Sequence, residues 1–390
     1  MSRLEELIAE LCPNGVEYKT LGEIALAIYR GSGITRDQIR DQGIPCVRYG
    51  EIYTAYDVWF NKCISFTDES IISNKKYFGY GDVLFAITGE KVEDIAKSCA
   101  YIGNERCLAG GDIVVIKHNQ NPKYLSYALS TKSAQAQKSK GKIKSKVVHS
   151  SVPAIQKILI PVPPLPVQEE IVRILDTFAE LTAELTAELT KRKQQYQYYR
   201  QQLYNFGDDI ESIPLRAWAV NCDARRKPIT KGKREAGIYP YYGASGIVDY
   251  VKDYLFDGDY LLVSEDGANL LARNTPIAFS ISGKTWVNNH AHILQFPNIT
   301  LQKYVEIYLN SIDLTKYIST AAQPKLTQDN LNRILIPKPS FEEISRIVSI
   351  LDRFDALCND LTSGLPAEIE ARKKQYEYYR DKLLTFKEAV

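Results

Sequence analysis

Residues 157–178 read KILIPVPPLPVQEEIVRILDTF, and residues 333–354 read RILIPKPSFEEISRIVSILDRF. After a filler that differs between the two copies, KRKQQYQYYRQQLYNF (residues 191–206) returns as ARKKQYEYYRDKLLTF (residues 371–386). The filler of the second copy is four residues longer. A repeat of this length indicates that the chain contains two copies of one architectural unit.

Each copy of the repeat predicts a long helix with one apolar stripe. The first copy begins with four prolines between Pro161 and Pro166, and its helix is expected to continue to about Leu203. Apolar residues recur at steps of three and four, with a coiled-coil stutter inside AELTAELTAELT (residues 179–190). The second copy contains SGLP (residues 363–366), which predicts a break or a kink.

The apolar stripes of the two predicted helices can pack against each other. A helix with a single apolar stripe must bury it, and the other copy carries the matching stripe. We therefore predict that the two repeats pair as an antiparallel coiled coil. The stripe residues are Leu175, Phe178, Leu181, Leu185, Leu189, Tyr196, Tyr199, Leu351, Phe354, Leu361, Tyr376 and Tyr379.

The segments before the two helical repeats are predicted to be strand-rich and related to each other. GIPCVRYG (residues 43–50) resembles GIYPYYG (residues 237–243), and the Gly-Asp turn at Gly81 resembles that at Gly258. The loops between these matches differ, a pattern typical of one scaffold that carries two recognition surfaces. In the first segment we predict strands at residues 46–49, 83–87, 98–102 and 112–116, a helix at 122–129 and a lysine-rich loop at 140–146.

These patterns predict an α+β fold with a pseudo-twofold repeat. The length of 390 residues and the hydrophobic content of 45% fit a globular protein of more than one domain. Two strand-rich units are expected to alternate with the two helical repeats, in the order 1–156, 157–206, 207–332 and 333–390.

Composition narrows the class of protein. The net charge is +2, so binding to nucleic acid would depend on local basic clusters. The seven cysteines form no C-x-x-C pair, which indicates reduced thiols in a cytoplasmic protein. MSRLEELIAELC (residues 1–12) predicts an amphipathic helix rather than a signal peptide, and no apolar run is long enough to span a membrane.

Motifs for catalysis are weak. The GKT at residues 283–285 lacks the first glycine of a phosphate-binding loop, because Ala278 stands in its place. His290 and His292 could share a strand face, but no carboxylate or cysteine cluster adjoins them in sequence, so polar histidines are a better interpretation than a metal site. Asp82 and Asp259 are interpreted as turn residues. We therefore predict no catalytic and no metal-binding residues in this chain.

Basic and tyrosine-rich stretches are better candidates for a site. Clustered arginine and lysine side chains fit contacts to DNA phosphates, with a few polar side chains that reach base edges, although each such residue could instead belong to a solvated charged face. The candidate DNA-binding residues are Arg30, Arg36, Arg48, Lys140, Lys142, Lys144, Lys146, Arg225, Arg226, Lys227, Lys231, Lys233, Arg234, Tyr241, Tyr242 and Lys325.

The order of these parts resembles a known family. Two divergent globular units alternate with two similar helices, and the entry IPVPPLPVQEEI (residues 160–171) and the AELT repeat are typical of it. The chain as a whole is similar to the specificity (S, HsdS) subunit of bacterial type I restriction-modification enzymes.

The resemblance implies a function that this chain performs without catalysis of its own. Each globular unit would be a target recognition domain that reads one half of a bipartite, asymmetric site in double-stranded DNA. The helices would set the distance between the halves and dock two methyltransferase subunits, which two restriction (motor-nuclease) subunits then join. The methyltransferase subunits would bring S-adenosylmethionine for adenine-N6 methylation and the restriction subunits ATP and Mg²⁺, with no cofactor bound by this chain.

Two other functions are compatible with parts of the sequence. An orphan DNA-modifying enzyme would require a methyltransferase or nuclease motif, and we find none. A scaffold in which the coiled coil is the whole function would leave the basic clusters without a role, and salt-dependent DNA binding would separate it from a specificity subunit.

Overall fold

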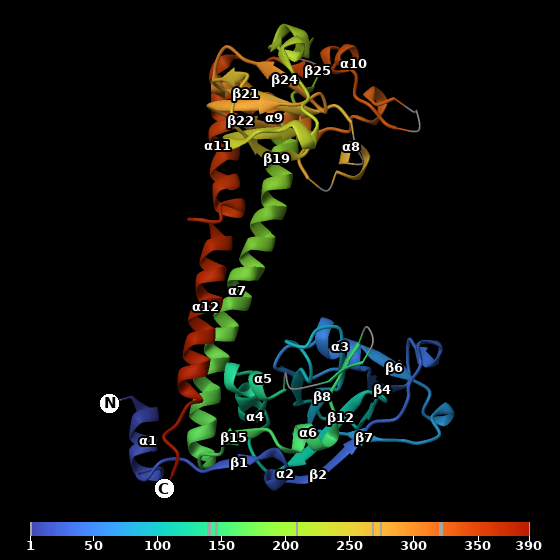
Figure 1. Ribbon diagram of the computed structural model, residues 1–390, viewed down its shortest axis with the longest axis vertical. Helices are drawn as coiled ribbons and strands as arrows, with labels where there is room; N and C mark the ends of the chain where they lie inside the picture. The colour runs from blue at the N-terminus through green and yellow to red at the C-terminus, as the bar shows by residue number, and fades with distance from the viewer. Residues whose placement is uncertain are drawn as a thin grey trace. The chain divides into compact units, whose positions relative to one another are not determined.

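The chain divides into two compact units. The computed structural model describes residues 2–138, 142–144, 147–207, 210–266, 269–273, 275–319 and 323–389. The first unit comprises Met1–Thr186 and Ile369–Val390, and the second comprises Ala187–Glu368. Each unit therefore combines a strand-rich segment with parts of both helical repeats (Figure 1).

The first unit is built on two five-stranded sheets and a smaller one. The first sheet has the order β2 (Ala25–Arg30), β12 (Ile113–His118), β8 (Val83–Ala86), β10 (Ser98–Tyr101) and β5 (Trp59–Phe60). The second has the order β3 (Ile39–Arg40), β6 (Ser65–Thr67), β4 (Ile44–Val47), β11 (Cys107–Ala109) and β7 (Tyr77–Phe78). A three-stranded sheet contains β13 (Lys142–Lys144), β14 (Val147–His149) and β9 (Thr88–Gly89).

The second unit repeats the arrangement of the two main sheets. One four-stranded sheet has the order β17 (Val220–Asn221), β24 (Ala291–Gln295), β21 (Tyr260–Ser264) and β22 (Ala278–Ile281). The other has the order β19 (Gly246–Val251), β18 (Ala236–Gly243), β23 (Lys284–Val287) and β20 (Phe256–Asp257). β11 is parallel to β4 and antiparallel to β7, and β23 has the same relation to β18 and β20. The predicted similarity of the two segments is therefore confirmed.

In each unit, one helix with a buried face contacts the start of a helical repeat. In the first unit this helix is α4 (Pro122–Leu129), in which Asn121 caps the N-terminus, and in the second it is α9 (Ile299–Ser311), capped by Asn298. The hydroxyl of Tyr124 donates to the carbonyl of Pro161 at 3.0 Å, and Tyr304 donates to Pro337 at the same distance. A tyrosine at the same place in both copies thus fixes where the proline-rich entry leaves the core.

Shorter elements complete both units. A strand pair precedes each long helix, β1 (Tyr18–Thr20) with β15 (Leu159–Pro161) and β16 (Ser212–Pro214) with β25 (Leu335–Pro337). The remaining helices are α1 (Arg3–Leu11), α2 (Leu21–Ile24), α3 (Tyr49–Thr54), α5 (Lys132–Lys138), α6 (Val152–Gln156), α8 (Asn269–Ala272) and α10 (Gln328–Asn332).

The C-terminal end of the chain is bonded to its N-terminal part within the first unit. The N–H of Val16 donates to the carbonyl of Lys387 at 2.8 Å, and the N–H of Ala389 donates to the carbonyl of Val16 at 3.0 Å. The hydroxyl of Tyr18 donates to the carbonyl of Phe386 at 3.1 Å. These bonds explain why the last residues of the sequence belong to the same unit as the first (Figure 1).

The helical repeats form one continuous helix and one interrupted helix. α7 spans Leu165–Leu203, whereas the second copy divides into α11 (Phe341–Asn359) and α12 (Leu365–Leu383). The predicted break is confirmed, and Pro366 falls in the first turn of α12, where a proline costs no hydrogen bond. Leu361 was assigned to the apolar stripe wrongly, because it lies within the break and its side chain is 80% exposed. Cys358, one turn earlier, is buried in its place.

The two repeats pair through the same aromatic contact in each unit. In the first unit Phe178 of α7 stacks on Tyr379 of α12, with ring centroids 5.5 Å apart. In the second unit Phe354 of α11 packs against Tyr199 of α7 at 5.6 Å and against Tyr196 at 6.5 Å. An early residue of each copy meets a late residue of the other, so the predicted antiparallel pairing and the α+β fold class are confirmed.

The other stripe residues are buried to different extents. Leu175 and Leu351 are fully buried, Leu185, Leu189 and Tyr376 are half-buried, and Leu181 and Tyr199 remain largely exposed. The stripe is therefore best covered at Leu175 and Leu351, which belong to the hydrophobic cores of the two units.

Two other predictions about secondary structure are corrected. The strand expected at residues 46–49 ends at Val47, because Arg48 and Glu51 exchange capping contacts that start α3. The lysine-rich loop expected at residues 140–146 contains the strand β13, which pairs with β14.

The seven cysteines are all buried free thiols. Within the described ranges, no helix is long and apolar enough to cross a membrane.

Replacement of Phe354 by alanine is expected to destabilise the second unit. The half-buried ring contacts two tyrosines of α7, so Phe354→Ala should lower the free energy of unfolding by on the order of 2 kcal/mol, somewhat less than for a fully buried phenylalanine. Urea denaturation measures this change. Leu361→Ala is the matched control and should change stability by less than about 0.5 kcal/mol. Equal effects of the two substitutions would contradict the aromatic pairing of the repeats.

Candidate nucleic-acid interface

Three of the predicted arginines meet at one concave surface of the first unit. Arg30, Arg36 and Arg48 line a hollow of about 930 Å³, which we call the arginine hollow. It lies where β2 ends, where β4 passes into α3, and where residues 110–112 connect β11 to β12. Arg30 is the last residue of β2, Arg36 lies on a 3-10 helix (Arg36–Gln38), and Arg48 caps α3, so three different elements bring the side chains together.

The three arginines differ in how firmly they are held. Arg30 donates from Nε to the carbonyl of Gly111 at 2.5 Å and forms an ion pair with Asp112. Arg48 donates from Nε to Glu51 at 3.0 Å, and Ser65 also donates to that buried carboxylate at 2.7 Å. Arg36 is exposed, and no ion pair reaches it from the part of the chain that the structure describes. The hollow thus combines two oriented guanidinium groups with one that is free for a phosphate.

Glycine is required at residue 31, where the loop after β2 crosses the turn between β11 and β12. A Cβ atom on Gly31 would lie 2.1 Å from the carbonyl oxygen of Gly110, a distance that no side chain tolerates. The close approach lets Ser32 donate its N–H to the carbonyl of Ala109 at 3.0 Å. Glycine-rich backbone from both segments therefore forms part of the lining of the hollow.

The lysine cluster of the first unit is only partly described. Lys142 and Lys144 lie on β13, whereas Lys140 and Lys146 fall outside the described residues. β13 reaches the rest of the unit through β14 and β9. The proposed role of these lysines in DNA binding stays a prediction.

The basic stretch of the second unit divides into free and committed side chains. Lys227, Lys231 and Lys233 are exposed, and among the described residues none of them has an ion-pair partner. Arg225 is exposed as well, but it donates to the carbonyl of Leu255 at 3.0 Å and lies over the ring of Phe256. Arg234 pairs with Asp249 at 3.0 Å and lies over Tyr241.

The two predicted tyrosines are buried to different extents in the second unit. Tyr241 is 1% exposed, and its hydroxyl accepts the N–H of Ile229 at 2.9 Å. Tyr242 is half-buried and packs against Phe279. Arg234 of the basic stretch lies over the ring of Tyr241, and the burial of Tyr241 leaves little surface for contact with a ligand.

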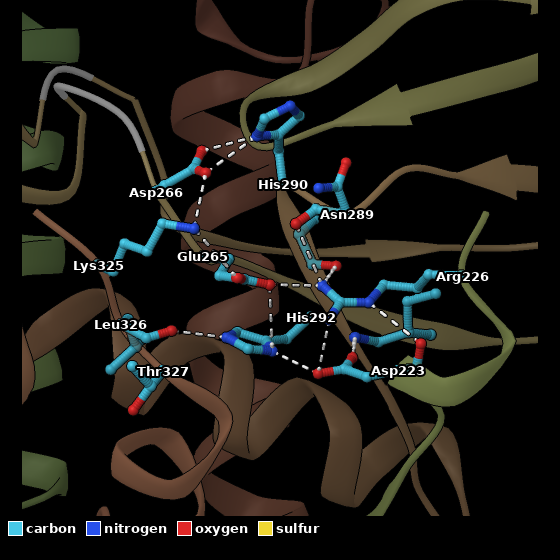
Figure 2. Close-up of polar contacts among 12 residues, drawn as sticks. Asp223, Arg226, Glu265, Asp266, Asn289, His290, His292, Lys325, Leu326 and Thr327 are labelled. Atoms are coloured by element: carbon cyan, nitrogen blue, oxygen red, sulfur yellow. Dashed lines mark hydrogen bonds and ion pairs between the residues drawn. The ribbon is translucent and has the colours of Figure 1, made fainter. Parts of the chain in front are cut away.

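Arg226 belongs to a buried ionic network, which Figure 2 shows. Its side chain is 14% exposed and bonds to Glu265 at 2.6 Å, to Asp223 at 3.3 Å and to the carbonyl of Ala291 at 2.8 Å. Lys325 extends the network, with its Nζ 3.7 Å from Glu265 and 3.8 Å from Asp266. Two of the predicted DNA contacts therefore also hold the second unit together.

His292 completes the buried part of this network. Its Nδ1 lies 2.5 Å from the carboxylate of Asp223, and its Nε2 lies 2.7 Å from the carbonyl of Leu326 (Figure 2). Burial acts to raise the pKa of Asp223, but the hydrogen bonds from His292 and from the N–H of Ile293, together with the charge of Arg226, outweigh it and leave that pKa lowered. Asp223 is thus a carboxylate that the fold keeps ionised.

Carboxylates adjoin the histidine pair in space, although none adjoins it in sequence. His292 contacts Asp223, and His290 contacts Asp266 at 2.9 Å, since residues distant in sequence converge on β24 and the turn before it. No group of three or more potential ligands that could hold a metal ion occurs among the described residues. Asp82 accepts the N–H of Gly79 at 2.9 Å, which confirms its role as a turn residue, and it also pairs with Lys117.

Comparison with known proteins identifies the family that this arrangement belongs to. A family model described as "Type I restriction modification DNA specificity domain" matches residues 13–192 and 220–371. A putative type I specificity subunit of Mycoplasma pneumoniae is 34% identical over 250 residues, which are 60% of this chain and 98% of that protein. The EcoR124I/EcoR124II specificity subunit of Escherichia coli is 34% identical over 259 residues, which are 59% of this chain and 63% of that protein.

Solved structures share the fold. The S subunit of a type I restriction-modification system from M. genitalium matches with a TM-score of 0.54 at 15% identity, and the match covers 95% of this chain and 96% of that one. A chain from a structure described as "Structural basis underlying complex assembly and conformational transition of the type I R-M system" has a TM-score of 0.60 at 16% identity. That match covers 96% of this chain and 98% of the other.

Loss of the Asp223 charge is expected to destabilise the second unit in a pH-dependent way. Asp223→Asn removes the carboxylate that contacts Nδ1 of His292 and one of the two that pair with Arg226, and should lower the free energy of unfolding at pH 7 by about 3 kcal/mol. Because the folded state lowers the pKa of Asp223, its contribution is present above about pH 4 and is lost as the pH falls below that value. Denaturation of both proteins between pH 3 and pH 7, in steps of about one unit, measures the difference.

The exposed Asp253 provides the control for this substitution. Asp253→Asn should change stability by less than about 0.5 kcal/mol at every pH. A difference between wild type and Asp223→Asn that did not shrink in acid would show that the charge is not the cause.

Proposed function

Because this chain belongs to the type I restriction-modification DNA specificity family, whose members recognise DNA sequence without catalysis of their own, we propose that it reads a bipartite, asymmetric site. Each unit contacts one half-site, and the bases between the halves are not read. The chain acts on double-stranded DNA together with methyltransferase and restriction subunits.

One observation carries this proposal. Four strands of each main sheet follow the same order in the two units, yet an arginine hollow lies at the ends of the corresponding strands in one unit and a largely buried ionic network in the other. A shared scaffold supports equivalent placement on two half-sites, and different surfaces support different half-site sequences. An asymmetric site with two unlike halves is what such a chain would select.

The paired repeats support the assembly that we propose. The contact of Phe178 with Tyr379 recurs as that of Phe354 with Tyr199, so the chain offers two similar helical surfaces. Two identical methyltransferase subunits can bind one on each. Two restriction subunits join them, and these partners bring S-adenosylmethionine, ATP and Mg²⁺.

Methylome sequencing tests the proposal directly. A host without DNA methylation would carry this chain with its methyltransferase partner, and a second strain would carry the partner alone. A bipartite motif with methyladenine in both halves, present only with this chain, is the expected result. No new methylation from a complex that assembles and holds DNA would contradict the function, and failure to bind DNA at any salt concentration would favour a scaffold instead.

We further propose that the AELT filler acts as a ruler for the gap between the half-sites. α7 is continuous through residues 179–190, so removal of residues 182–185 shortens the helix by about 6 Å and rotates its C-terminal part by about 40°. One base-pair step is about 3.4 Å and about 34°. The deletion should therefore reduce the permitted gap by one or two base pairs and leave the half-site letters unchanged.

A control of the same helix length accompanies the deletion. The double substitution Thr182→Ala and Glu184→Ala alters the filler but keeps its length, and should leave both gap and letters as in the wild type. Methylome sequencing of hosts that carry the wild type, the deletion variant or the double substitution shows the gap and the letters that each protein selects. Altered letters in the deletion variant, or an unaltered gap, would overturn the ruler.

A further inference from the structure

The turn of residues 110–112, which lines the arginine hollow, has a counterpart in the second unit. In the first unit the N–H of Gly110 donates to the carbonyl of Val47 at 2.8 Å, and in the second the N–H of Asn288 donates to Tyr242 at 3.0 Å. Further along, Ile113 at the start of β12 pairs with Ala86 at the end of β8, and Ala291 at the start of β24 pairs with Ser264 at the end of β21. The turn of residues 288–290 therefore stands where residues 110–112 stand in the first unit.

The ionic network fixes this turn from beneath. The N–H of His290 donates to Oδ1 of Asn288 at 2.8 Å, and the carbonyl of His290 accepts the N–H of Glu265 at 2.9 Å. Asp266 holds the imidazole of His290, and Arg226 donates to the carbonyl of Ala291, directly after the turn (Figure 2). Four independent contacts thus orient a turn of three residues, as recognition of a base edge requires.

The side chain of Asn289 is left unused by this support. Asn289 is exposed, and its amide makes no hydrogen bond to any described residue, whereas its neighbours Asn288 and His290 are both bonded. Figure 2 shows the amide beside His290 with no contact drawn to it. A carboxamide on a fixed turn can donate and accept at once, which matches N7 and the N6 amino group of adenine in the major groove.

The charges around the turn permit the approach of DNA. The carboxylates of Asp223, Glu265 and Asp266 are each paired with a cationic or imidazole group, and their side chains are 5%, 17% and 10% exposed. Lys227 follows Arg226 directly and has no ion-pair partner among the described residues, and Lys325 is 43% exposed at the other side of the network. Cations at the rim can bind phosphates while the acidic groups stay covered.

We propose that Asn289, presented by the turn of residues 288–290, is a specificity-determining residue of the second unit and selects an adenine in one half of the DNA site. This inference rests on the proposed function and deepens it, because it assigns one base of the site to one side chain. The ionic network is then a positioning device for that contact.

The test compares the motifs methylated by the wild-type chain and by Asn289→Ala, each with its methyltransferase partner in a methylation-free host. The variant should accept other bases at one position of one half-site, with discrimination for adenine there reduced roughly 10-fold or more. The other half-site and the gap should not change. Asn104→Ala, at an exposed turn of the first unit, is the matched control and should keep the wild-type motif.

Each other outcome has a definite meaning. An unchanged motif for Asn289→Ala would overturn the assignment of this residue and leave the proposed function intact. Loss of all methylation, from a variant that unfolds at the wild-type temperature, would also overturn it, since that result indicates a general role in affinity or assembly. Absence of any motif with the wild-type chain would overturn the proposed function itself and this inference with it.

Discussion

The fold depends on one contact that the chain makes twice, between a phenylalanine early in one helical repeat and a tyrosine late in the other. Neither helix has a fully apolar surface, and the two aromatic pairs add large apolar contacts between the repeats. Because the contact is reciprocal, each compact unit contains a part of both helices. The first unit is therefore made of two segments that are far apart in the sequence.

The same reciprocity explains how the ends of the chain are used. Residues 369–390 follow the second unit in sequence but belong to the first unit in space. There, Val16 and Tyr18 form hydrogen bonds with residues 386–389. The break between α11 and α12 lies next to the boundary between the units. A proline at the start of α12 resumes the helix without loss of a hydrogen bond.

The recognition surfaces show how one scaffold supports different chemistry. In the first unit glycines let backbone segments touch, and arginines line the hollow beside them. In the second unit Asp223, Arg226 and His292 form an ionic network next to the corresponding turn, which has a different sequence. Buried charges of this kind add little stability over an apolar core, but they fix the geometry of the turn that they hold. That difference fits the proposed recognition of two unlike half-sites.

The sequence by itself determined the architecture of this protein. The long repeat, the steps of its apolar residues and the Gly-Pro interruption were sufficient for two related units, paired antiparallel helices and a break in the second, since periodicity and backbone limits are local properties. Only the tertiary structure decided the site. It brought Arg30, Arg36 and Arg48 to one hollow, buried Tyr241, and placed Asp223 and Asp266 beside histidines that lie far from them in sequence. Such neighbours depend on strand pairing between distant segments, and no local pattern encodes which side chains will meet at a sheet edge.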